Sequence, residues 1–186
     1  MLPQSSKHLL SEPLSSALNF AVLGFAARSG TGKTTLLKQL IPVLKARQLR
    51  LGLIKHTHHR ITFDNAGITR RVFAGGVNVI ATSPQLSMAE YHVTNAQDAL
   101  SEGITGYQHL PIDLLLIEGF KAAAFPKIEL HRHSLNQPLL CLDDQHIVAV
   151  ASDVSTLDLP RQLPLLPLNN PAAIAAWIVQ NICRSI

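Results

Sequence analysis

The chain has few cysteines, few aromatic residues and no long hydrophobic run, and each shortage excludes a class of protein. Its two cysteines, Cys141 and Cys183, are too far apart in sequence to indicate a disulfide framework or a zinc site, so buried thiols are expected. No apolar stretch approaches the roughly 20 residues that a membrane-spanning helix requires. The N-terminal segment MLPQSSKHLLSEPLSS lacks the basic start and continuous apolar stretch of a signal peptide, which predicts a cytoplasmic protein.

Nucleic acid is not an expected partner. Aromatic residues make up only 5% of the chain, which leaves few side chains for base stacking, and no run of Lys and Arg marks a nucleic-acid surface. The formal net charge of +4 and the pI near 9.3 instead suit an anionic ligand. The length of 186 residues and the absence of internal repeats predict one domain over residues 18–186, after a loosely ordered extension over residues 1–17.

The most informative stretch is NFAVLGFAARSGTGKTTLL, residues 19–37. A short apolar run is followed by a glycine-containing loop and then by a helix that opens at Lys33, which is the context that a GxxxxGK[ST] phosphate-binding loop requires. Ala27 stands where the first glycine usually stands, and an alanine is acceptable there if its backbone dihedral angles are ordinary. The alternative is a strand-to-helix turn that binds no ligand.

The predicted loop has the chemistry of a nucleotide site. Its backbone N–H groups would surround a phosphate, and the N-terminus of the following helix would add partial positive charge at the same point. Lys33 would contact the β- and γ-phosphates, and the Thr34 hydroxyl would bind Mg²⁺. The residues expected to hold the nucleotide here are Arg28, Ser29, Gly30, Thr31, Gly32, Lys33, Thr34 and Thr35.

Apolar strands that alternate with helices predict an α/β fold of the P-loop NTPase type, with a mostly parallel β-sheet flanked by helices. The proline-rich residues 159–168 are expected to run over the surface. Strands are expected at residues 20–25, 51–55, 77–81, 86–93, 112–117, 127–130 and 147–151.

Three longer helices are expected. The first covers residues 33–47, with a kink or a restart at Pro42. The second covers residues 95–110 and is expected to be interrupted near its two glycines. The last begins at Pro171, with Asn170 as its N-cap.

A magnesium–nucleotide site needs an acidic group besides the loop threonine, at the C-terminal end of a neighbouring buried strand. Glu118 directly follows the apolar residues IDLLLI and meets this requirement. The alternative for Glu118 is a solvated carboxylate at a strand end. Asp113 opens the same strand and is expected at the opposite end of the sheet. Lys121, Lys127 and Arg132 follow Glu118 and make this edge basic.

Further candidate ligands follow the predicted strands. His56, His58 and His59 leave the second strand at the edge where open α/β sheets bind ligands, and they are interpreted as a solvated loop, as phosphate or substrate contacts, or as a metal site. A three-histidine site is awkward, because His59 would lie on the other side of an extended chain. Asp64 is interpreted as a ligand of magnesium through water, as a residue that aligns an attacking water, or as an ordinary loop residue. Asp153 stands where some P-loop GTPases read guanine, although the full N-K-x-D pattern is absent.

Several blocks of the sequence together resemble one known family. The blocks are ARSGTGKTTL, GLIKHTHH, DLLLIEGFK, PKIEL and HIVAVASDV, over about residues 20–155. They resemble the molybdopterin-guanine dinucleotide biosynthesis protein B (MobB) family, which tolerates alanine at the Ala27 position. The resemblance implies a P-loop α/β fold, binding of GTP and Mg²⁺, weak GTPase activity and a homodimer. It also implies assistance to a MobA-type guanylyltransferase, which attaches GMP to molybdopterin.

Carried over to this sequence, the resemblance implies that residues 30–35 hold phosphates and that Thr34 and Glu118 serve Mg²⁺. Lys33, Glu118 and Asp64 are then the expected catalytic residues. After FDNAG the family usually continues with a lysine-aspartate pair, whereas this chain continues with ITRR. The missing acid implies either that hydrolysis is slower still or that Asp64 or Glu118 alone manages water or Mg²⁺.

Three other functions stay open. A nickel or zinc metallochaperone GTPase would use the histidine cluster. A small-molecule kinase would use the same loop, but it also needs a phosphate acceptor and a lid of arginines, which the sequence does not identify. A binding module would use the nucleotide only to gate a partner surface.

Overall fold

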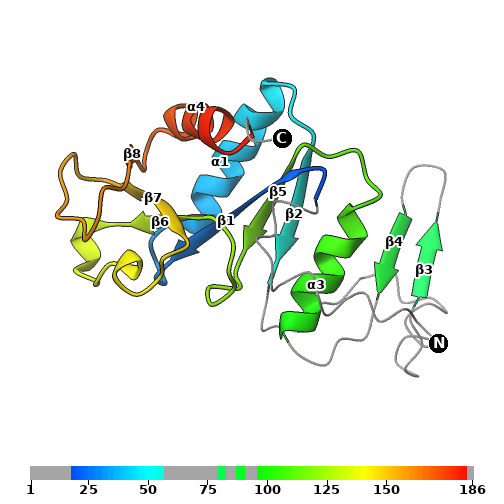
Figure 1. The fold of residues 1–186 in the computed structure, drawn as a ribbon. Coiled ribbons are helices and arrows are strands. Elements are labelled where there is room, and N and C mark those ends of the chain that lie inside the picture. Colours follow the sequence, from blue (N-terminus) through cyan, green and yellow to red (C-terminus); the bar gives the residue numbers. More distant parts are fainter. Residues whose placement is uncertain (1–17, 57–78, 83–86, 91–95, 184–186) are drawn as a thin grey trace.

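The computed structural model describes residues 18–56, 79–82, 87–90 and 96–183. Six strands form its main sheet, in the order β2-β5-β1-β6-β7-β8, and every neighbouring pair is parallel (Figure 1). This confirms the predicted α/β class with a parallel sheet. The strands are β1 (Ala21–Ala27), β2 (Leu51–Lys55), β5 (Leu114–Glu118), β6 (Lys127–His131), β7 (Ile147–Ser152) and β8 (Leu165–Pro167).

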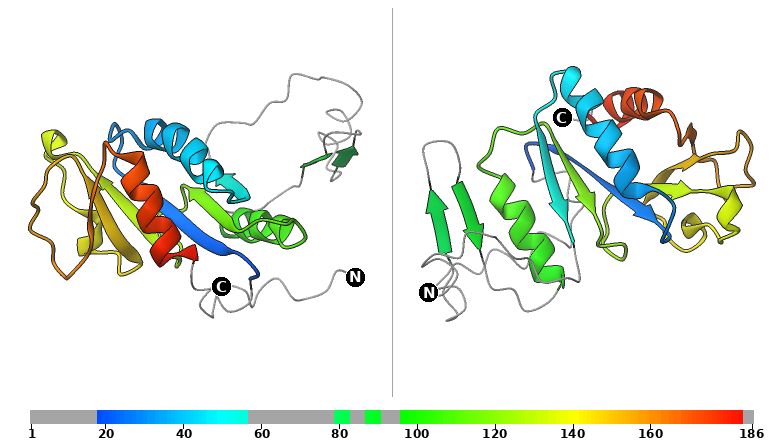
Figure 2. Two further views of the ribbon diagram at one scale, coloured as in Figure 1. Left: turned by 90° about the horizontal axis from the view of Figure 1, so that it is seen from above. Right: turned by 180° about the vertical axis from the view of Figure 1, so that it is seen from behind.

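The sheet is covered on both faces, which explains why its central strands are apolar throughout. All seven residues of β1 are buried, and alternate side chains point to opposite faces. Leu23 packs with α1 (Lys33–Ala46) and α4 (Pro171–Asn181) on one face. Val22 packs with α3 (Ala96–Tyr107) on the other (Figures 1 and 2). None of the described helices is long and apolar enough to cross a membrane.

Helix α1 is a single helix, so the predicted restart at Pro42 is wrong. The helix buries Leu40 and Leu44 completely, as the apolar periodicity predicts. Pro42 lies on the exposed side, where the backbone carbonyl that loses its hydrogen bond can be solvated. The proline is therefore accommodated without dividing the helix.

Helix α3 is also continuous, and the predicted interruption at Gly103 and Gly106 is wrong. Gly103 faces the edge strand β2, where a Cβ atom would lie 2.9 Å from the Ile54 Cδ1 atom. Glycine at this position therefore allows close packing of the helix against the strand, and it does not end the helix.

The strand predicted at residues 77–81 exists as β3 (Val79–Thr82), but it does not join the main sheet. It pairs antiparallel with β4 (Ser87–Glu90) in a separate two-stranded sheet. The connection over residues 83–86 is too short for the crossover that a parallel pair requires. A hairpin is consequently the arrangement that this spacing allows.

The expectation that residues 159–168 run over the surface is wrong for their second half. Residues Leu165–Pro167 form β8, the edge strand beside β7. Leu166 and Leu168 point into the core and are only 7% and 4% exposed. Pro167 is tolerated because an edge strand needs no hydrogen-bond donor on its outer side.

Two further predictions about strand and helix ends are confirmed. The Asn170 Oδ1 atom accepts a hydrogen bond from Ala173 N (3.0 Å), so Asn170 caps α4 and Pro171 begins it. Asp113 lies at the N-terminal end of β5, far along the strand from Glu118, and its carboxylate accepts hydrogen bonds from Arg50 N (2.7 Å) and Arg50 Nε (3.0 Å).

The substitution Asp113→Asn is expected to remove a pH-dependent part of the stability. Hydrogen bonds from the Arg50 side chain, and then from its backbone, hold the pKa of the Asp113 carboxyl at about 2 instead of 3.8. Because this pKa is lowered in the folded state, the stabilisation is fully present above about pH 4 and is lost as the pH falls through about 2. Urea unfolding should therefore show a difference between wild type and variant that is largest at neutral pH and narrows in acid. A difference that stays constant with pH would contradict this.

Candidate nucleotide-binding site

The glycine-containing loop joins the end of β1 to the start of α1. Gly30 and Gly32 have φ angles of +80° and +98°, which residues with a Cβ atom rarely adopt. Ala27 is still part of β1 and pairs with Leu130 of β6, so its backbone is extended and needs no glycine. The alanine at the first position of the motif is compatible with a phosphate-binding loop.

The loop leaves the N-terminus of α1 open. Gly32 is the N-cap and offers no side chain to bond the first N–H groups of the helix, and the first turn contains no acidic residue. The Thr31 hydroxyl donates to the carbonyl oxygen of Arg28 (2.8 Å) and so fixes the turn from inside. The N–H groups and the positive end of the helix dipole therefore remain available for an anion.

A cavity of about 520 Å³ lies at this loop. It brings the predicted loop residues together with Glu118, which comes from a different strand. The Lys121 side chain, from the segment after β5, adds a further positive charge to the lining. The cavity is lined by Ala27, Arg28, Ser29, Gly30, Thr31, Gly32, Lys33, Thr34, Thr35, Glu118 and Lys121.

Glu118 is the last residue of β5, and the parallel register aligns it with Phe25 of β1 and Lys55 of β2. The residue is only 8% exposed. Its carboxylate oxygens lie 4.0 Å from Lys33 Nζ and 3.4 Å from Lys55 Nζ. Burial of a carboxylate to this depth is unfavourable unless such partners compensate its charge.

Positive charge exceeds negative charge around Lys33. Burial lowers the pKa of the Lys33 ammonium group below its ordinary value, and Glu118 partly opposes this effect. The nearby ammonium groups of Lys121 and Lys55 lower the pKa further. An anionic ligand in the cavity would relieve this repulsion and stabilise the charged form of Lys33.

The chain turns sharply after Glu118. Gly119 and Phe120 have φ angles of +109° and +50°. His56 N donates to the carbonyl oxygen of Glu118 (2.8 Å), and the His56 ring lies 4.5 Å from the Phe120 ring between centroids. His56 therefore packs against the turn that follows the acidic residue.

The other predicted residues of this edge lie outside the described residues. These are His58, His59 and Asp64, whose roles stay predictions. Within the part of the chain that the structure describes, no group of three or more His, Cys, Asp or Glu side chains is arranged to hold a metal ion.

The residues at the loop fit a magnesium ion that is bound together with a nucleotide. The Thr34 hydroxyl and the Glu118 carboxylate line the same cavity, and both are hard oxygen donors of the kind that Mg²⁺ prefers. Mg²⁺ usually takes its other ligands from phosphates and water, so few protein ligands are needed.

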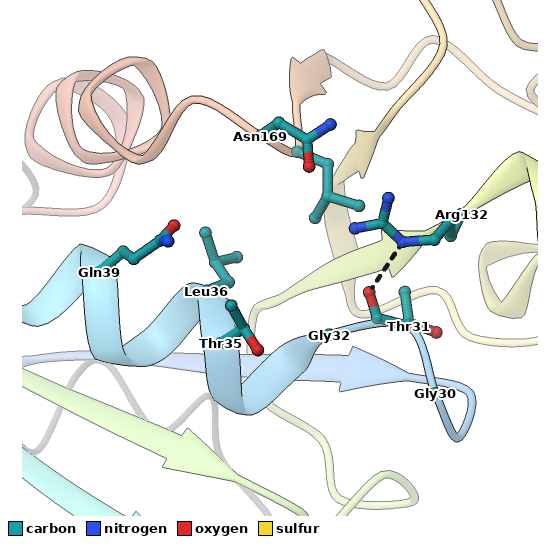
Figure 3. A pocket seen from close by; sticks show the side chains of 9 residues that line it. Gly30, Thr31, Gly32, Thr35, Leu36, Gln39, Arg132 and Asn169 are labelled. Atoms are coloured by element: carbon teal, nitrogen blue, oxygen red, sulfur yellow. Dashed lines mark hydrogen bonds between the residues drawn. The ribbon is translucent and has the colours of Figure 1, made fainter.

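A second cavity, of about 290 Å³, borders the same loop beside α1 (Figure 3). Arg132 extends toward the loop from the end of β6, and its Nε atom donates to the carbonyl oxygen of Thr31 (3.4 Å). The two cavities share four loop residues, which are Gly30, Thr31, Gly32 and Thr35. The lining residues are Gly30, Thr31, Gly32, Thr35, Leu36, Gln39, Arg132, Leu168 and Asn169.

Asp153 holds Arg132 in place. Its Oδ1 atom accepts from His133 N (2.8 Å), and its Oδ2 atom lies 3.4 Å from Arg132 Nη1. The hydrogen bond from His133 is the main reason why the pKa of Asp153 is lowered. Both carboxylate oxygens are thus engaged within the protein, and the reading of guanine by Asp153 stays a prediction.

Two cations near the loop come from other strands. Arg132, which the sequence placed only on a basic edge, directly follows β6 and lines the second cavity. Lys55 ends β2 and contacts Glu118, and its position at a strand end is a signal that could have indicated it. Gln39 and Asn169 also line the second cavity, but nothing in their local sequence marks them. Their proximity follows from the packing of α1 beside the segment before α4.

The family model described as molybdopterin guanine dinucleotide synthesis protein B, MobB, matches residues 22–153. This range contains the loop, Glu118 and Asp153. The chain belongs to the MobB family. The predicted resemblance is therefore confirmed.

Two relatives of this chain carry the name molybdopterin-guanine dinucleotide biosynthesis adapter protein. The protein from Escherichia coli K12 is 38% identical over 163 residues, which cover 86% of this chain and 91% of the relative. The protein from Haemophilus influenzae is 37% identical over 161 residues, which cover 84% and 86%.

Solved MobB structures share the fold. The structure of Bacillus subtilis MobB matches with a TM-score of 0.64 at 22% identity and covers 88% of this chain and 98% of that chain. A MobB homologue from Bacillus stearothermophilus matches with a TM-score of 0.62 at 22% identity, covering 89% and 99%. The α/β fold of this chain is therefore shared with solved MobB structures.

The substitution Gly119→Ala is expected to lower the free energy of unfolding by roughly 2 kcal/mol, because the new side chain would be strained at φ +109° and its Cβ would lie 2.6 Å from His56 Cβ. Gly106→Ala is the matched control. No heavy atom lies within 4 Å of its added Cβ in helix α3, so it should raise stability by up to about 1 kcal/mol. Chemical denaturation measures both, and a Gly119→Ala variant as stable as wild type would contradict the tight turn.

Proposed function

We propose that this protein is a Mg²⁺-dependent GTP-binding accessory protein of molybdenum cofactor biosynthesis, which assists the guanylylation of molybdopterin. The observation that carries the proposal is the convergence of an open helix N-terminus, Lys33 and Glu118 on one cavity with excess positive charge. The adapter names of the two relatives support the pathway.

The phosphates would bind along the loop. The N–H groups at the start of α1 would donate to phosphate oxygens, and Lys33 would contact the β- and γ-phosphates. Thr34 and Glu118 would hold Mg²⁺, which neutralises charge on the phosphate oxygens when it is bound. Among the described residues, Glu118 is the single carboxylate that lines this cavity. A lone acid beside the phosphates supports slow hydrolysis and a role in binding.

The base would occupy the cavity beside Arg132. The amide groups of Gln39 and Asn169 can each donate and accept hydrogen bonds, and the Arg132 guanidinium can donate or stack on a ring. This lining accommodates a purine that has both donors and acceptors. The preference for guanine rests on family membership.

The expected partners are a MobA-type guanylyltransferase with its molybdopterin substrate and a second copy of this chain. The word adapter in the names of the relatives supports a protein partner. The histidine cluster that would favour a metallochaperone lies mostly outside the described residues, so no observation favours that alternative.

The substitution Lys33→Ala is expected to weaken GTP binding at least about tenfold, because it removes a charge-assisted contact to phosphate. Lys38→Ala is the control, since Lys38 is an exposed lysine on the same helix that lines neither cavity. Calorimetric titration with GTP and ATP, each with and without Mg²⁺, should show GTP bound more tightly than ATP. Absence of guanine-nucleotide binding, with no effect of Lys33→Ala, would refute the proposed function.

Glu118→Gln is expected to remove the effect of Mg²⁺ on GTP binding. Without Mg²⁺, the variant should bind GTP at least as tightly as wild type, because a negative charge near the phosphates is gone. With Mg²⁺, wild type should bind more tightly and the variant should not. The exposed Glu102→Gln on α3 serves as the charge-matched control, and a full Mg²⁺ effect in Glu118→Gln would exclude Glu118 as a magnesium ligand.

A further inference from the structure

The segment that joins β5 to β6 brings a lysine into the wall of the phosphate-binding cavity. Lys121 follows Glu118 closely in the sequence, lines the same cavity and is exposed. Within the described part of the chain, no carboxylate lies within ion-pair distance of its ammonium group. Burial is the main reason why the pKa of Lys33 is lowered, and the charge of Lys121 adds to this effect. The two ammonium groups therefore interact across the cavity.

Lys121 lies at the end of the site where Glu118 is found. The first cavity contains both residues, whereas the second cavity contains Arg132 and shares only loop residues with the first. In P-loop proteins the metal bridges the β- and γ-phosphates, and the acid that serves it lies beside them. With the base beside Arg132, as the proposed function has it, Lys121 is at the end where the last phosphate lies.

A second lysine fixes the position of this segment. Lys127 does not join the basic edge that the sequence predicts, because it is only 1% exposed and lines neither cavity of the nucleotide site. Its ammonium group donates to the carbonyl oxygens of Lys121 (3.1 Å) and Ala123 (2.6 Å). The same nitrogen lies 2.9 Å from the Asp144 Oδ2 atom. An ammonium group has three N–H donors, so these contacts can engage all of them within the protein.

The distant partner of Lys127 belongs to a segment that is itself held in place. The Arg161 guanidinium donates to the carbonyl oxygens of Asp144 (3.0 Å) and of Ile147 (2.8 Å), the first residue of β7. Lys121 lines a further cavity together with Asp144 and Arg161, so the two segments are neighbours. Lys127 thus joins the backbone of Lys121 to a part of the protein with a defined structure.

Strand β1, which leads into the phosphate loop, leaves room for the buried lysine. Gly24 has no side chain, and a Cβ atom there would overlap the Phe125 ring and lie 2.8 Å from Lys127 Cγ. The Lys127 ammonium group lies 5.0 Å from the centre of the Phe125 ring. Gly24 N also donates to the carbonyl oxygen of Pro126 (2.8 Å). The strand and the segment together therefore determine where Lys121 enters the cavity.

We propose that Lys121 contacts the terminal phosphate of the nucleotide and makes the site prefer a triphosphate to a diphosphate, with Lys127 as its positioning residue. A triphosphate has a further anionic group at the end of the cavity where Lys121 lies, and a charge-assisted hydrogen bond forms only with this group. Because Lys127 already holds the backbone of Lys121, less conformational freedom is lost when the phosphate binds. This inference rests on the proposed function and adds the residue that distinguishes the length of the phosphate chain.

The phosphate contact is tested by titration of the full-length protein with GTP and with GDP, both in the presence of Mg²⁺. Wild type should bind GTP more tightly than GDP. Lys121→Gln should weaken GTP binding at least about tenfold and GDP binding less than about twofold, because a charge-assisted contact to the terminal phosphate is lost. Lys121→Arg, which keeps the charge, should retain most of the preference. Lys38→Gln, which removes a remote positive charge on α1, should change neither affinity.

The positioning role is tested by Lys127→Met, which keeps an apolar stem but has no ammonium group. This variant should lower the affinity for GTP severalfold and leave that for GDP nearly unchanged, because only Lys121 is displaced. In a double-mutant cycle, Lys127→Met should add little to the effect of Lys121→Gln. Asp144→Asn is the matched control. It disturbs the same buried pair but leaves both carbonyl contacts of Lys127, so it should lower stability without changing the ratio of the two affinities.

The proposal is overturned if Lys121→Gln weakens GTP and GDP binding by the same factor, or weakens neither. A loss in Lys127→Met that adds in full to that of Lys121→Gln would overturn the positioning role. Circular dichroism checks that Lys127→Met is folded. If it is not, Lys127→Gln, which keeps a donor group, replaces it in the cycle, and Lys121→Gln still decides the phosphate contact.

Failure of this inference can be told apart from failure of the proposed function. A wild-type protein that binds neither GTP nor GDP would refute the proposed function and the inference together. A protein that binds GTP, but whose preference over GDP is unchanged in Lys121→Gln, would overturn the inference alone. The same titrations with ATP and ADP separate the base from the phosphate chain. Preference for adenine nucleotides, with the effect of Lys121→Gln intact, would refute the choice of guanine and support the phosphate contact.

Discussion

The candidate site depends on the contact of one buried carboxylate with two ammonium groups. Glu118 lies between Lys33 and Lys55 because β2, β5 and β1 are adjacent and parallel, and their register brings the strand ends to the same level. Without this carboxylate, several cations would face one another around an open helix N-terminus. The tight turn at Gly119 and the contact with His56 then fix the direction in which the chain leaves the site.

Strand β6 connects the sites on either side of it. Lys127 and Glu129 are buried and hold the segments that follow β5 and precede β7, while Arg132, just beyond the strand, reaches the loop of α1. Lys121, whose carbonyl oxygen accepts a hydrogen bond from Lys127, lines the phosphate cavity.

Local patterns in the sequence predicted the order of strand, loop and helix around the candidate phosphate loop and the place of Glu118 at a strand end. These patterns gave wrong predictions where contacts between residues far apart in the sequence determine the structure. Gly103 does not end the helix, and it allows α3 to pack closely against β2. Leu166 is buried because β8 pairs with β7. Gln39 and Arg161 carry no local signal, since only the folded chain brings them to a cavity.

The position of the nucleotide and its metal tests the central claim most directly. A crystal structure with Mn²⁺ in place of Mg²⁺ and a non-hydrolysable GTP analogue would locate the metal by anomalous scattering. The account predicts phosphates on the loop of residues 28–35, a metal between Thr34 and Glu118, and the base in the cavity beside Arg132. Phosphates bound away from the loop, or a metal near neither Thr34 nor Glu118, would contradict it.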